Sequence, residues 1–245
     1  MSHREKEFCL TLIRHGQTSA NLLRHVQGHS DTPLTDLGLK QAYSLANYLK
    51  SNTSWHEFDR IYSSDLARAL ETSKIIKSIC CSQGKEIVTD VRLRERKYGH
   101  LYEGRPIENL RLDALRAGSD LAQYTPHGAE SRDEVRARVV DFFYNVVAAE
   151  SSDGDEILIV SHWATIKEFL KLFQSKCNEI KEEHIRETPN TAYSRFRIRC
   201  RNVADPQGKN NDEQREQLTV NVNVISLHQT LHLNMESTSA KLTDK

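Results

Sequence analysis

Apolar and polar positions alternate along this chain with two different periods, one typical of strands and the other of helices. Four short, mostly apolar runs have the length of strands, and they lie at 8–13, 59–62, 86–89 and 157–160. Longer segments carry apolar residues on one side, as amphipathic helices do, and they lie at 36–50, 65–80, 107–117, 131–149 and 164–173. This alternation predicts an α/β domain with a mainly parallel central sheet.

Two further segments, 192–199 and 218–227, alternate polar and apolar residues and predict strands at the edge of the sheet. The polar stretch 204–216 is expected to be the loop that joins them. The sheet is therefore expected to end in an antiparallel edge strand.

The segment 90–129 is irregular, with scattered Gly and Pro, and we expect it to form a small cap over the carboxyl ends of the strands. The whole pattern predicts a three-layer sandwich with helices on both faces of the sheet. We expect one domain over 1–230 and a disordered tail at 231–245.

Three of the predicted strands lead into residues of one chemical kind. Arg14, His15 and Gly16 follow the first strand, Arg68 lies one turn beyond the second, and His162 follows the fourth. Ligands of open parallel sheets bind beyond the carboxyl ends of the strands, so this topology brings two Arg and two His together. Gly16 is expected to permit a sharp exit from the strand and close approach of a ligand. One Arg-His pair after a strand is usually surface decoration, but three such strand ends favour a binding site.

This local positive charge belongs to a neutral chain. Lys and Arg number 34 and Asp and Glu number 34, so the formal net charge is zero, which argues against nucleic acid as a partner. Arg68 falls in the first turn of its helix, where free N–H groups and the helix dipole also favour an anion. A cationic pocket in a neutral protein suits a phosphate ester.

Hydropathy and cysteine content predict where the protein acts. No run approaches the roughly 18 apolar residues of a membrane span, and the charged N-terminus MSHREKE lacks the apolar segment of a secretory signal. The five cysteines are an odd number without a C-x-x-C motif, which indicates free thiols in a reducing compartment. We expect a cytoplasmic protein with no membrane partner.

Five motifs resemble those of the histidine phosphatase (phosphoglycerate mutase-like) superfamily. LIRHGQTSAN resembles the signature R-H-G-x-[ST]-x-x-N, and SSDLARALET, LRERKYG, GAES and VSHWATI resemble later motifs in the same order, over about residues 8–200. LRERKYG, TPHGAE and TPNTAYS are most similar to the fructose-2,6-bisphosphatases of this superfamily. The resemblance implies a hydrolase that acts on a small sugar phosphate and lowers glycolytic flux.

The resemblance also implies a covalent mechanism. His15 is expected to be the nucleophile, because a neutral imidazole nitrogen can attack phosphorus at pH 7 and form a phosphohistidine that water then hydrolyses. Glu95 is expected to protonate the leaving group and afterwards to activate water. The alternative for Glu95 is an ion pair within R-x-R-E-R, whose arginines surround it.

The same resemblance assigns the groups that hold the substrate. Arg14, Arg68 and His162 are expected to neutralise the phosphate oxygens, and His162 is counted among the catalytic residues. Asn21 would add a neutral donor. Further residues expected near the substrate are Gly16, Gln27, Gly28, Tyr98, Arg105 and Trp163.

Two positions depart from the family pattern. Trp163 replaces the small residue that commonly follows the second catalytic histidine, and its indole is expected to narrow the pocket or to stack on a sugar. Gln17 replaces a commoner Glu. Gly128, Glu130 and Ser131 are expected to start the long helix, where Glu130 suits the helix dipole.

Two H-x-x-x-H pairs have a spacing that can bind zinc on a helix. His25 and His29 flank a loop glycine, and His228 and His232 lie at the end of a predicted strand, without a third ligand nearby. The sequence contains no G-x-x-x-x-G-K-[ST] loop. We therefore expect neither a metal nor another cofactor.

The leading hypothesis is a metal-independent sugar-phosphate phosphatase. The alternatives are a cofactor-dependent phosphoglycerate mutase or a broad-specificity phosphatase, and, from another class, a non-catalytic protein that binds phosphorylated ligands. Mutases of this kind carry a longer cap, whereas only 32 residues separate Glu95 from Gly128 here, which favours hydrolysis. The intact His15, Glu95 and His162 argue against a non-catalytic role.

Overall fold

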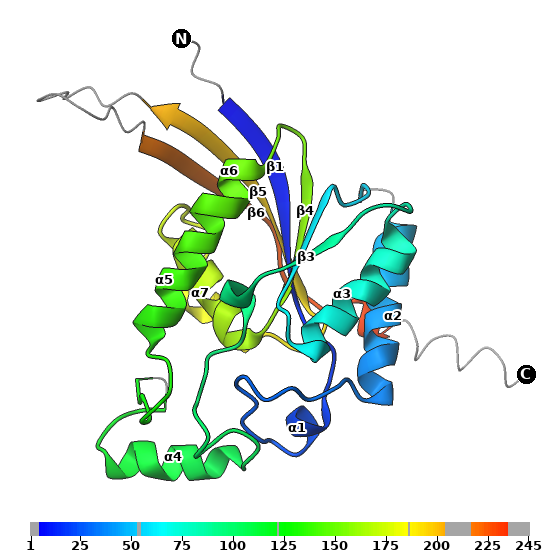
Figure 1. Ribbon diagram of the computed structural model, residues 1–245. Coiled ribbons are helices and arrows are strands. Elements are labelled where there is room, and N and C mark those ends of the chain that lie inside the picture. The colour runs from blue at the N-terminus through cyan, green and yellow to red at the C-terminus, as the bar shows by residue number, and fades with distance from the viewer. Residues whose placement is uncertain (1–4, 53–54, 122, 186, 204–216, 235–245) are drawn as a thin grey trace, which may run out of the picture.

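The computed structural model describes residues 5–52, 55–121, 123–185, 187–203 and 217–234. Within these ranges, six strands form one mixed sheet in the order β3-β2-β4-β1-β5-β6 (Figure 1). The strands are β1 (Glu5–Arg14), β2 (Arg60–Ser63), β3 (Ile87–Thr89), β4 (Glu156–Ser161), β5 (Tyr193–Val203) and β6 (Gln217–Gln229). Strands β3, β2, β4 and β1 pair in parallel and β5 and β6 pair antiparallel, which confirms the expected α/β class.

The register of the parallel strands brings their carboxyl ends together. Arg14 of β1 lies opposite Ser161 of β4, and Ser63 of β2 lies opposite Val160. The pairing continues one residue beyond β1, because His15 N donates to Ser161 O at 3.0 Å. The residues that follow these three strands therefore emerge at one edge of the sheet, as the sequence predicted.

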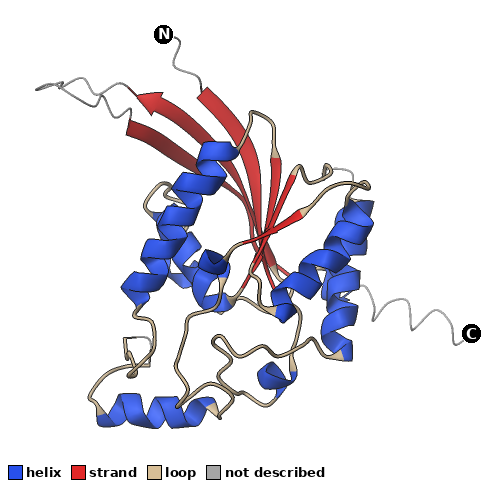
Figure 2. Ribbon diagram, in the orientation of Figure 1, coloured by secondary structure: helices blue, strands red, loops and turns tan. Residues whose placement is uncertain are grey.

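Helices cover both faces of the sheet and complete the three layers (Figure 2). The helices α2 (Asp36–Ser51) and α3 (Ala67–Cys80) lie on one face, and α5 (Arg132–Phe142), α6 (Ala148–Glu150) and α7 (Trp163–Gln174) lie on the other. Helix α2 begins where expected, because Thr35 Oγ1 accepts from Gly38 N at 3.0 Å and caps its first turn. Among the helices of the described ranges, none has both the length and the apolar character needed to cross a membrane.

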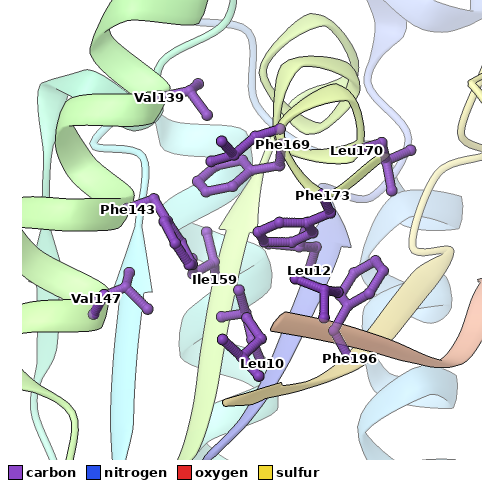
Figure 3. Close-up of a cluster of buried hydrophobic side chains, with 14 of the residues drawn as sticks. Leu10, Leu12, Val139, Phe143, Val147, Ile159, Phe169, Leu170, Phe173 and Phe196 are labelled. Atoms are coloured by element: carbon purple, nitrogen blue, oxygen red, sulfur yellow. The ribbon is translucent and has the colours of Figure 1, made fainter. Parts of the chain in front are cut away.

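An apolar core fills the space between the sheet and the helices α5 to α7 (Figure 3). Phe173 of α7 makes edge-on contacts with Phe143 and Phe196, whose ring centroids lie 5.4 and 4.9 Å away. Leu10 and Leu12 of β1 are fully buried in the same cluster. Each such side chain contributes about 1.5–3 kcal/mol by burial, so β1 is a rigid support for the polar residues at its end.

The segment between β3 and α5 forms the expected cap. Its longest helix, α4 (Ile107–Arg116), lies beyond the carboxyl ends of the strands, on the same side as the short α1 (Ser19–Leu22) (Figure 1). Val26, Tyr102 and Leu110 form a small apolar cluster that joins α4 to the loop after α1. The cap is thus attached to the edge where the strands end.

The structure corrects three expectations about the elements. Strand β5 is not at an edge, because it pairs with β1 on one side and β6 on the other. The long helix begins at Arg132 and is interrupted by a π-helical turn, η2 (Phe143–Val147). The apolar side of the helix predicted at 36–50 included Leu37, but Leu37 is exposed in the first turn of α2, because the buried stripe of that helix runs through Gly38 instead.

The first four residues of the segment predicted as a tail are part of the described structure. Residues 231–234 follow β6 in an ordered turn, and the His232 side chain is fully buried there. Its backbone oxygen accepts from Ser44 Oγ of α2 at 2.6 Å. The predicted loop 204–216 and the tail residues 235–245 lie outside the described residues.

Candidate active site

The imidazole of His15 is held in one tautomer directly after β1. Its Nδ1 lies 2.7 Å from Gly16 O, and because a carbonyl oxygen can only accept, Nδ1 carries the proton. The side chain is 2% exposed. Burial, followed by the charges of Arg68 and Arg14, holds the pKa of His15 well below its usual value. The ring is therefore neutral at pH 7, and Nε2 retains its lone pair.

His162 lies beside His15, at the start of α7. The centroids of the two rings are 5.1 Å apart, and His162 is fully buried. Neither of its ring nitrogens has a hydrogen-bond partner among the described residues. Burial and then Arg68 hold its pKa well below the ordinary value too.

Arg14 and Arg68 are buried, and among the described residues neither forms a close salt bridge with a buried carboxylate. Arg14 donates from Nη1 to the carbonyl of Thr188 and, at 3.4 Å, to the exposed carboxylate of Glu187. Arg68 is fully buried and donates to two loop carbonyls, Gly28 O and Ser30 O, each at 2.9 Å. Within the described part of the chain, Nε of each arginine has no partner. Burial lowers the pKa of Arg68 to about 10, which shows how poorly its charge is compensated.

These four side chains together favour an anion. Arg68 and Arg14 each lower the pKa of both imidazoles, so the cations lie close to the two rings. Buried donors that lack partners are costly, and a phosphate group offers three acceptor oxygens and up to two negative charges. The charge and the free donors of these side chains therefore suit a bound anion such as a phosphate group.

Asn21 is oriented by the neighbouring turn. Its Oδ1 accepts from Thr18 N at 3.1 Å and from Asn190 Nδ2 at 3.3 Å, which leaves its own amide Nδ2 as a donor. Gln27 Oε1 accepts from Thr18 Oγ1 at 2.8 Å and so supports the same turn. The carbonyl of Gly28, a residue with φ of 53°, is one of the two that hold Arg68.

Glu95 is held by backbone N–H groups. Its Oε1 accepts from Arg96 N at 2.8 Å and from Ala164 N, in the first turn of α7, at 3.1 Å. Its carbonyl accepts from His29 Nε2 at 2.9 Å and from Arg138 Nη2 at 3.2 Å. Hydrogen bonds thus hold both the side chain and the backbone carbonyl of Glu95, and Oε2 remains for proton transfer.

The ion-pair alternative for Glu95 does not match the structure. Arg92 binds Asp90 and Asp141, Arg94 binds Asp65, and Arg96 donates to backbone carbonyls of the cap. Among the described residues, none of these arginines forms a salt bridge with Glu95. A carboxylate that its basic neighbours leave free is suited to acid–base chemistry.

The fold gives Gly16 a structural reason that the sequence did not indicate. A Cβ at this position would lie 2.5 Å from Gly38 O, so the missing side chain lets β1 pass the start of α2. Gly16 N donates to Thr72 Oγ1 at 3.0 Å and its carbonyl fixes the His15 tautomer. Gly16 thus acts on the site through His15.

Three further candidates lie around the cap. Tyr98 packs on the small cap cluster with the Arg96 guanidinium 5.1 Å from its ring centroid, and burial raises its pKa to about 12. Arg105 is exposed in the turn before α4. Trp163 is half-buried at the first position of α7, outside both main apolar clusters, with Lys167 Nζ 5.7 Å from its ring centroid.

Glu130 does not serve the helix dipole as expected. It precedes Ser131, which is the N-cap of α5, and Gly128 lies in the preceding turn with φ of 77°. The Glu130 carboxylate accepts from Lys97 N at 2.8 Å and from Arg138 Nε at 3.0 Å. It therefore holds the irregular segment that carries Glu95.

The sequence analysis gave no role to the loop 187–191, although this loop contacts the site. Asn190 Nδ2 donates to His15 O at 3.0 Å, and Thr188 O accepts from Arg14. The loop precedes β5, which is antiparallel to β1, so the beginning of this strand reaches the same edge as the ends of the others. A rule that examines only the carboxyl ends of strands therefore misses this loop. The polar segment TPNT, directly before a predicted strand, was the signal that could have indicated it.

The H-x-x-x-H histidines do not gather around a common point. His29 contacts the Glu95 carbonyl, whereas His228 and His232 contact the loop 187–191. Across the described ranges, no three His, Cys, Asp or Glu side chains are grouped so that they could hold a metal ion.

Comparison with known proteins identifies the relatives of this chain. The family described as the histidine phosphatase superfamily (branch 1) matches residues 10–208. Fructose-2,6-bisphosphatase TIGAR of Xenopus tropicalis is 44% identical over 154 residues, which cover 61% of this chain and 54% of that protein. A probable phosphoglycerate mutase, GpmB, of Yersinia pestis is 46% identical over 99 residues, which cover 40% of this chain and 42% of that protein. The chain spans about half the length of the curated relatives it matches.

Solved structures agree with the fold. A phosphoglycerate mutase from Bacillus anthracis superposes with a TM-score of 0.73 at 20% identity and covers 95% of this chain and 98% of its own. A phosphoserine phosphatase from Entamoeba histolytica, in complex with 3-phosphoglyceric acid, has a TM-score of 0.64 at 27% identity and covers 92% and 99%. The similarity to the mutase shows the fold alone. The second structure has the same fold at higher identity and is that of a phosphatase.

Proposed function

The chain belongs to the histidine phosphatase superfamily, and from this premise we propose that it hydrolyses phosphate monoesters through a phosphohistidine at His15. The observation that carries the proposal is the lone pair on His15 Nε2 beside buried, unpaired nitrogens of Arg14, Arg68 and His162. A nucleophile next to unsatisfied donors is what transfer of a phosphoryl group requires.

In the first step, His15 Nε2 attacks phosphorus. The P–N bond forms as the ester P–O bond breaks, and Glu95, entering as the acid, gives its proton to the departing alkoxide. In the second step, the Glu95 carboxylate takes a proton from water while the resulting hydroxide attacks phosphorus. The P–N bond breaks, inorganic phosphate leaves, and His15 and Glu95 return to their first states.

The remaining groups stabilise charge during both steps. Arg14 and Arg68 hold the oxygens that stay on phosphorus, and His162 and Asn21 add further donors. Because these protein groups already neutralise the phosphate, the reaction needs no divalent cation. We expect activity to survive exhaustive treatment with EDTA.

We propose fructose-2,6-bisphosphate as the substrate, hydrolysed in the cytoplasm with the effect of lowering glycolytic flux. The curated relatives named as fructose-2,6-bisphosphatases support this choice. The cap supports it as well, because a second phosphate needs a cation there that no carboxylate already occupies. Arg92, Arg94, Arg111 and Arg116 are all engaged in salt bridges. Of the exposed cap cations that the structure describes, Arg105 and Lys97 have no such partner.

Phosphoglycerate mutase is the second candidate, because the GpmB relatives match at 46% identity. A mutase returns the phosphoryl group from His15 to a second hydroxyl of the substrate, whereas a phosphatase gives it to water. The two activities therefore differ in the acceptor and share every residue assigned above.

A panel of esters tests both candidates. Phosphate release from fructose-2,6-bisphosphate, 3-phosphoglycerate and an aryl phosphate is followed beside the conversion of 3- to 2-phosphoglycerate. We expect the highest kcat/KM for the bisphosphate, and we expect Arg105→Ala to reduce that preference. Arg111→Ala is the matched control, because its guanidinium is 2.8 Å from Glu108. Faster transfer between the glycerate positions than to water would assign the chain to the mutases.

A further inference from the structure

The two histidines of HQTLH are directed at one loop. His228 Nδ1 lies 3.2 Å from Thr188 Oγ1, and His232 Nε2 lies 2.9 Å from Thr191 Oγ1. Both threonines belong to the loop 187–191, at its two ends. The residues whose spacing suggested zinc therefore hold backbone that contacts the site.

This loop contains a backbone conformation that needs support. Thr191 has φ of 56°, in the left-handed region that β-branched residues rarely occupy. Such a conformation is strained and persists only where its surroundings hold it. Thr191 Oγ1 donates to Asn190 O at 2.7 Å, so its hydrogen bond with His232 is one in which Nε2–H donates.

Both histidines are themselves anchored. His228 Nε2 donates to His184 O at 2.7 Å, which leaves Nδ1 to accept from Thr188 Oγ1. His232 is fully buried, and its carbonyl accepts from Ser44 of α2. Each imidazole thus joins the loop to a different part of the fold.

The loop passes this constraint to the phosphate site. Thr191 N donates to Arg14 O at 3.0 Å, and Asn190 Nδ2 donates to His15 O at 3.0 Å. The carbonyl of Thr188 accepts from the Arg14 guanidinium. A change in the loop conformation would therefore move both the nucleophile and one of the two arginines.

We propose that His228 and His232 are positioning residues of the phosphate site, which fix the loop 187–191 and through it the orientation of Arg14 and His15. The inference rests on the proposed function, since it concerns the site where phosphate is bound. It makes the end of β6 and the turn that follows it part of that site, although His228 and His232 lie beyond residues 10–208, which the superfamily matches.

The decisive experiment combines His232→Ala with Thr191→Gly. Glycine adopts a positive φ without steric cost, so it should remove the need for the hydrogen bond from His232. We expect His232→Ala to weaken the binding of inorganic phosphate, and to lower kcat/KM for an aryl phosphate, by about 10-fold, as loss of a residue that orients a ligating group does. Adding Thr191→Gly should restore most of the phosphate binding and most of kcat/KM. It should not restore the melting temperature, which falls because the buried imidazole is lost.

Val222→Ala is the matched control. Val222 is a buried residue of β6 that packs in the main core, so this variant loses stability without touching the loop. It should leave phosphate binding and kcat/KM unchanged. The proposal fails if His232→Ala and Val222→Ala behave alike at equal melting temperature, or if Thr191→Gly restores nothing.

Two further measurements complete the test. If His232→Ala does not fold, His228→Gln replaces it and should weaken phosphate binding in the same direction, and unchanged binding overturns the proposal. Titration with inorganic phosphate also separates this inference from the proposed function. A wild-type protein that binds phosphate but hydrolyses no ester contradicts the proposed function alone, whereas one that binds no phosphate contradicts both.

Discussion

Two buried arginines of this protein have opposite environments. Arg195 of β5 lies 2.6 Å from Glu156 Oε1, and its guanidinium carbon is 4.1 Å from the centroid of the Trp55 ring. Arg68 of α3 is more deeply buried, but its hydrogen bonds go to backbone carbonyls, and burial lowers its pKa to about 10.

The difference separates a structural ion pair from a binding site. A buried charge is costly, and Glu156 offsets that cost for Arg195 within the folded chain. No carboxylate of the described residues does the same for Arg68 at salt-bridge distance, and in the proposed function an anionic ligand has that role. Burial of an arginine alone therefore does not indicate a binding site. A buried arginine that has no carboxylate partner does.

The largest loss of activity should come from replacing the proposed nucleophile, His15, which lies beside the unpaired Arg68. We expect His15→Ala to lower turnover of a phosphate ester by on the order of 10³-fold or more, because no covalent intermediate can form. The control is His56→Ala, an exposed histidine near the Arg195 pair, which should keep full activity. Steady-state kinetics decide, and turnover retained by purified His15→Ala would rule out the covalent route.

The second effect contrasts the two arginines directly. Arg68→Met should lower kcat/KM by on the order of 10²-fold while leaving the free energy of unfolding equal or higher, since it removes an unpaired buried charge. Arg195→Met should do the reverse: it leaves Glu156 buried alone, costs about 3–5 kcal/mol of stability and spares kcat. Denaturant melts and kinetics on both variants test the comparison, and equal stability losses would abolish it.

A third effect, of comparable size in stability, comes from the two tryptophans. Trp55 contacts Phe58 and Tyr193 edge-on and supports Arg195, so Trp55→Ala should cost about 3–5 kcal/mol. Trp163 lies outside the main apolar clusters. Trp163→Ala should therefore change stability by less than about 1 kcal/mol and instead alter KM several-fold, more for bulky esters than for small ones. A large stability loss with unchanged selectivity would place Trp163 among the structural residues.

The smallest effect concerns protonation. The folded pKa values of His15 and His162 are well below the ordinary value, and burial lowers that of His232 to about 4. Unfolded histidines take up protons near pH 6.5 while these three stay neutral, so stability is complete above that pH and falls as pH decreases toward 4. The slope is about 1.4 kcal/mol per pH unit for each histidine.

Denaturant melts at pH 7, 6 and 5 measure this slope. Inorganic phosphate should reduce it, because a bound anion favours the protonated imidazoles of the site. His232→Gln should reduce the slope of the unfolding free energy against pH by the contribution of one histidine. A stability that does not change between pH 7 and 5 would contradict the neutral state assigned to the buried rings.

Much of the fold and the centre of the site could be predicted from the sequence. Strand and helix periods are set by burial on one face, which the residue types record directly. The rule for parallel strands then places Arg14, His15, Arg68 and His162 together, because it depends on topology alone.

The remaining contacts depend on tertiary packing that no local pattern encodes. The contacts of Glu130 with Lys97, and of His228 and His232 with the loop 187–191, join residues far apart in the chain. The sequence therefore indicated only a helix start for Glu130 and no role for the two histidines. The loop before β5 was missed because it reaches the site from the beginning of an antiparallel strand. Gly16 was predicted as a position where a ligand approaches closely, and the group that lies closest to it in the fold is the backbone of Gly38.

The contact between Gly16 and Gly38 has a consequence for changing this protein by directed evolution. A Cβ on Gly16 would lie 2.5 Å from Gly38 O, and one on Gly38 would lie 2.1 Å from Gln17 O. A larger residue at either position would push the start of α2 away from the residue beside His15, and no substitution at the other position could make room. Mutant libraries that seek new substrates should therefore keep both glycines fixed and diversify exposed positions of the cap instead, such as Arg105.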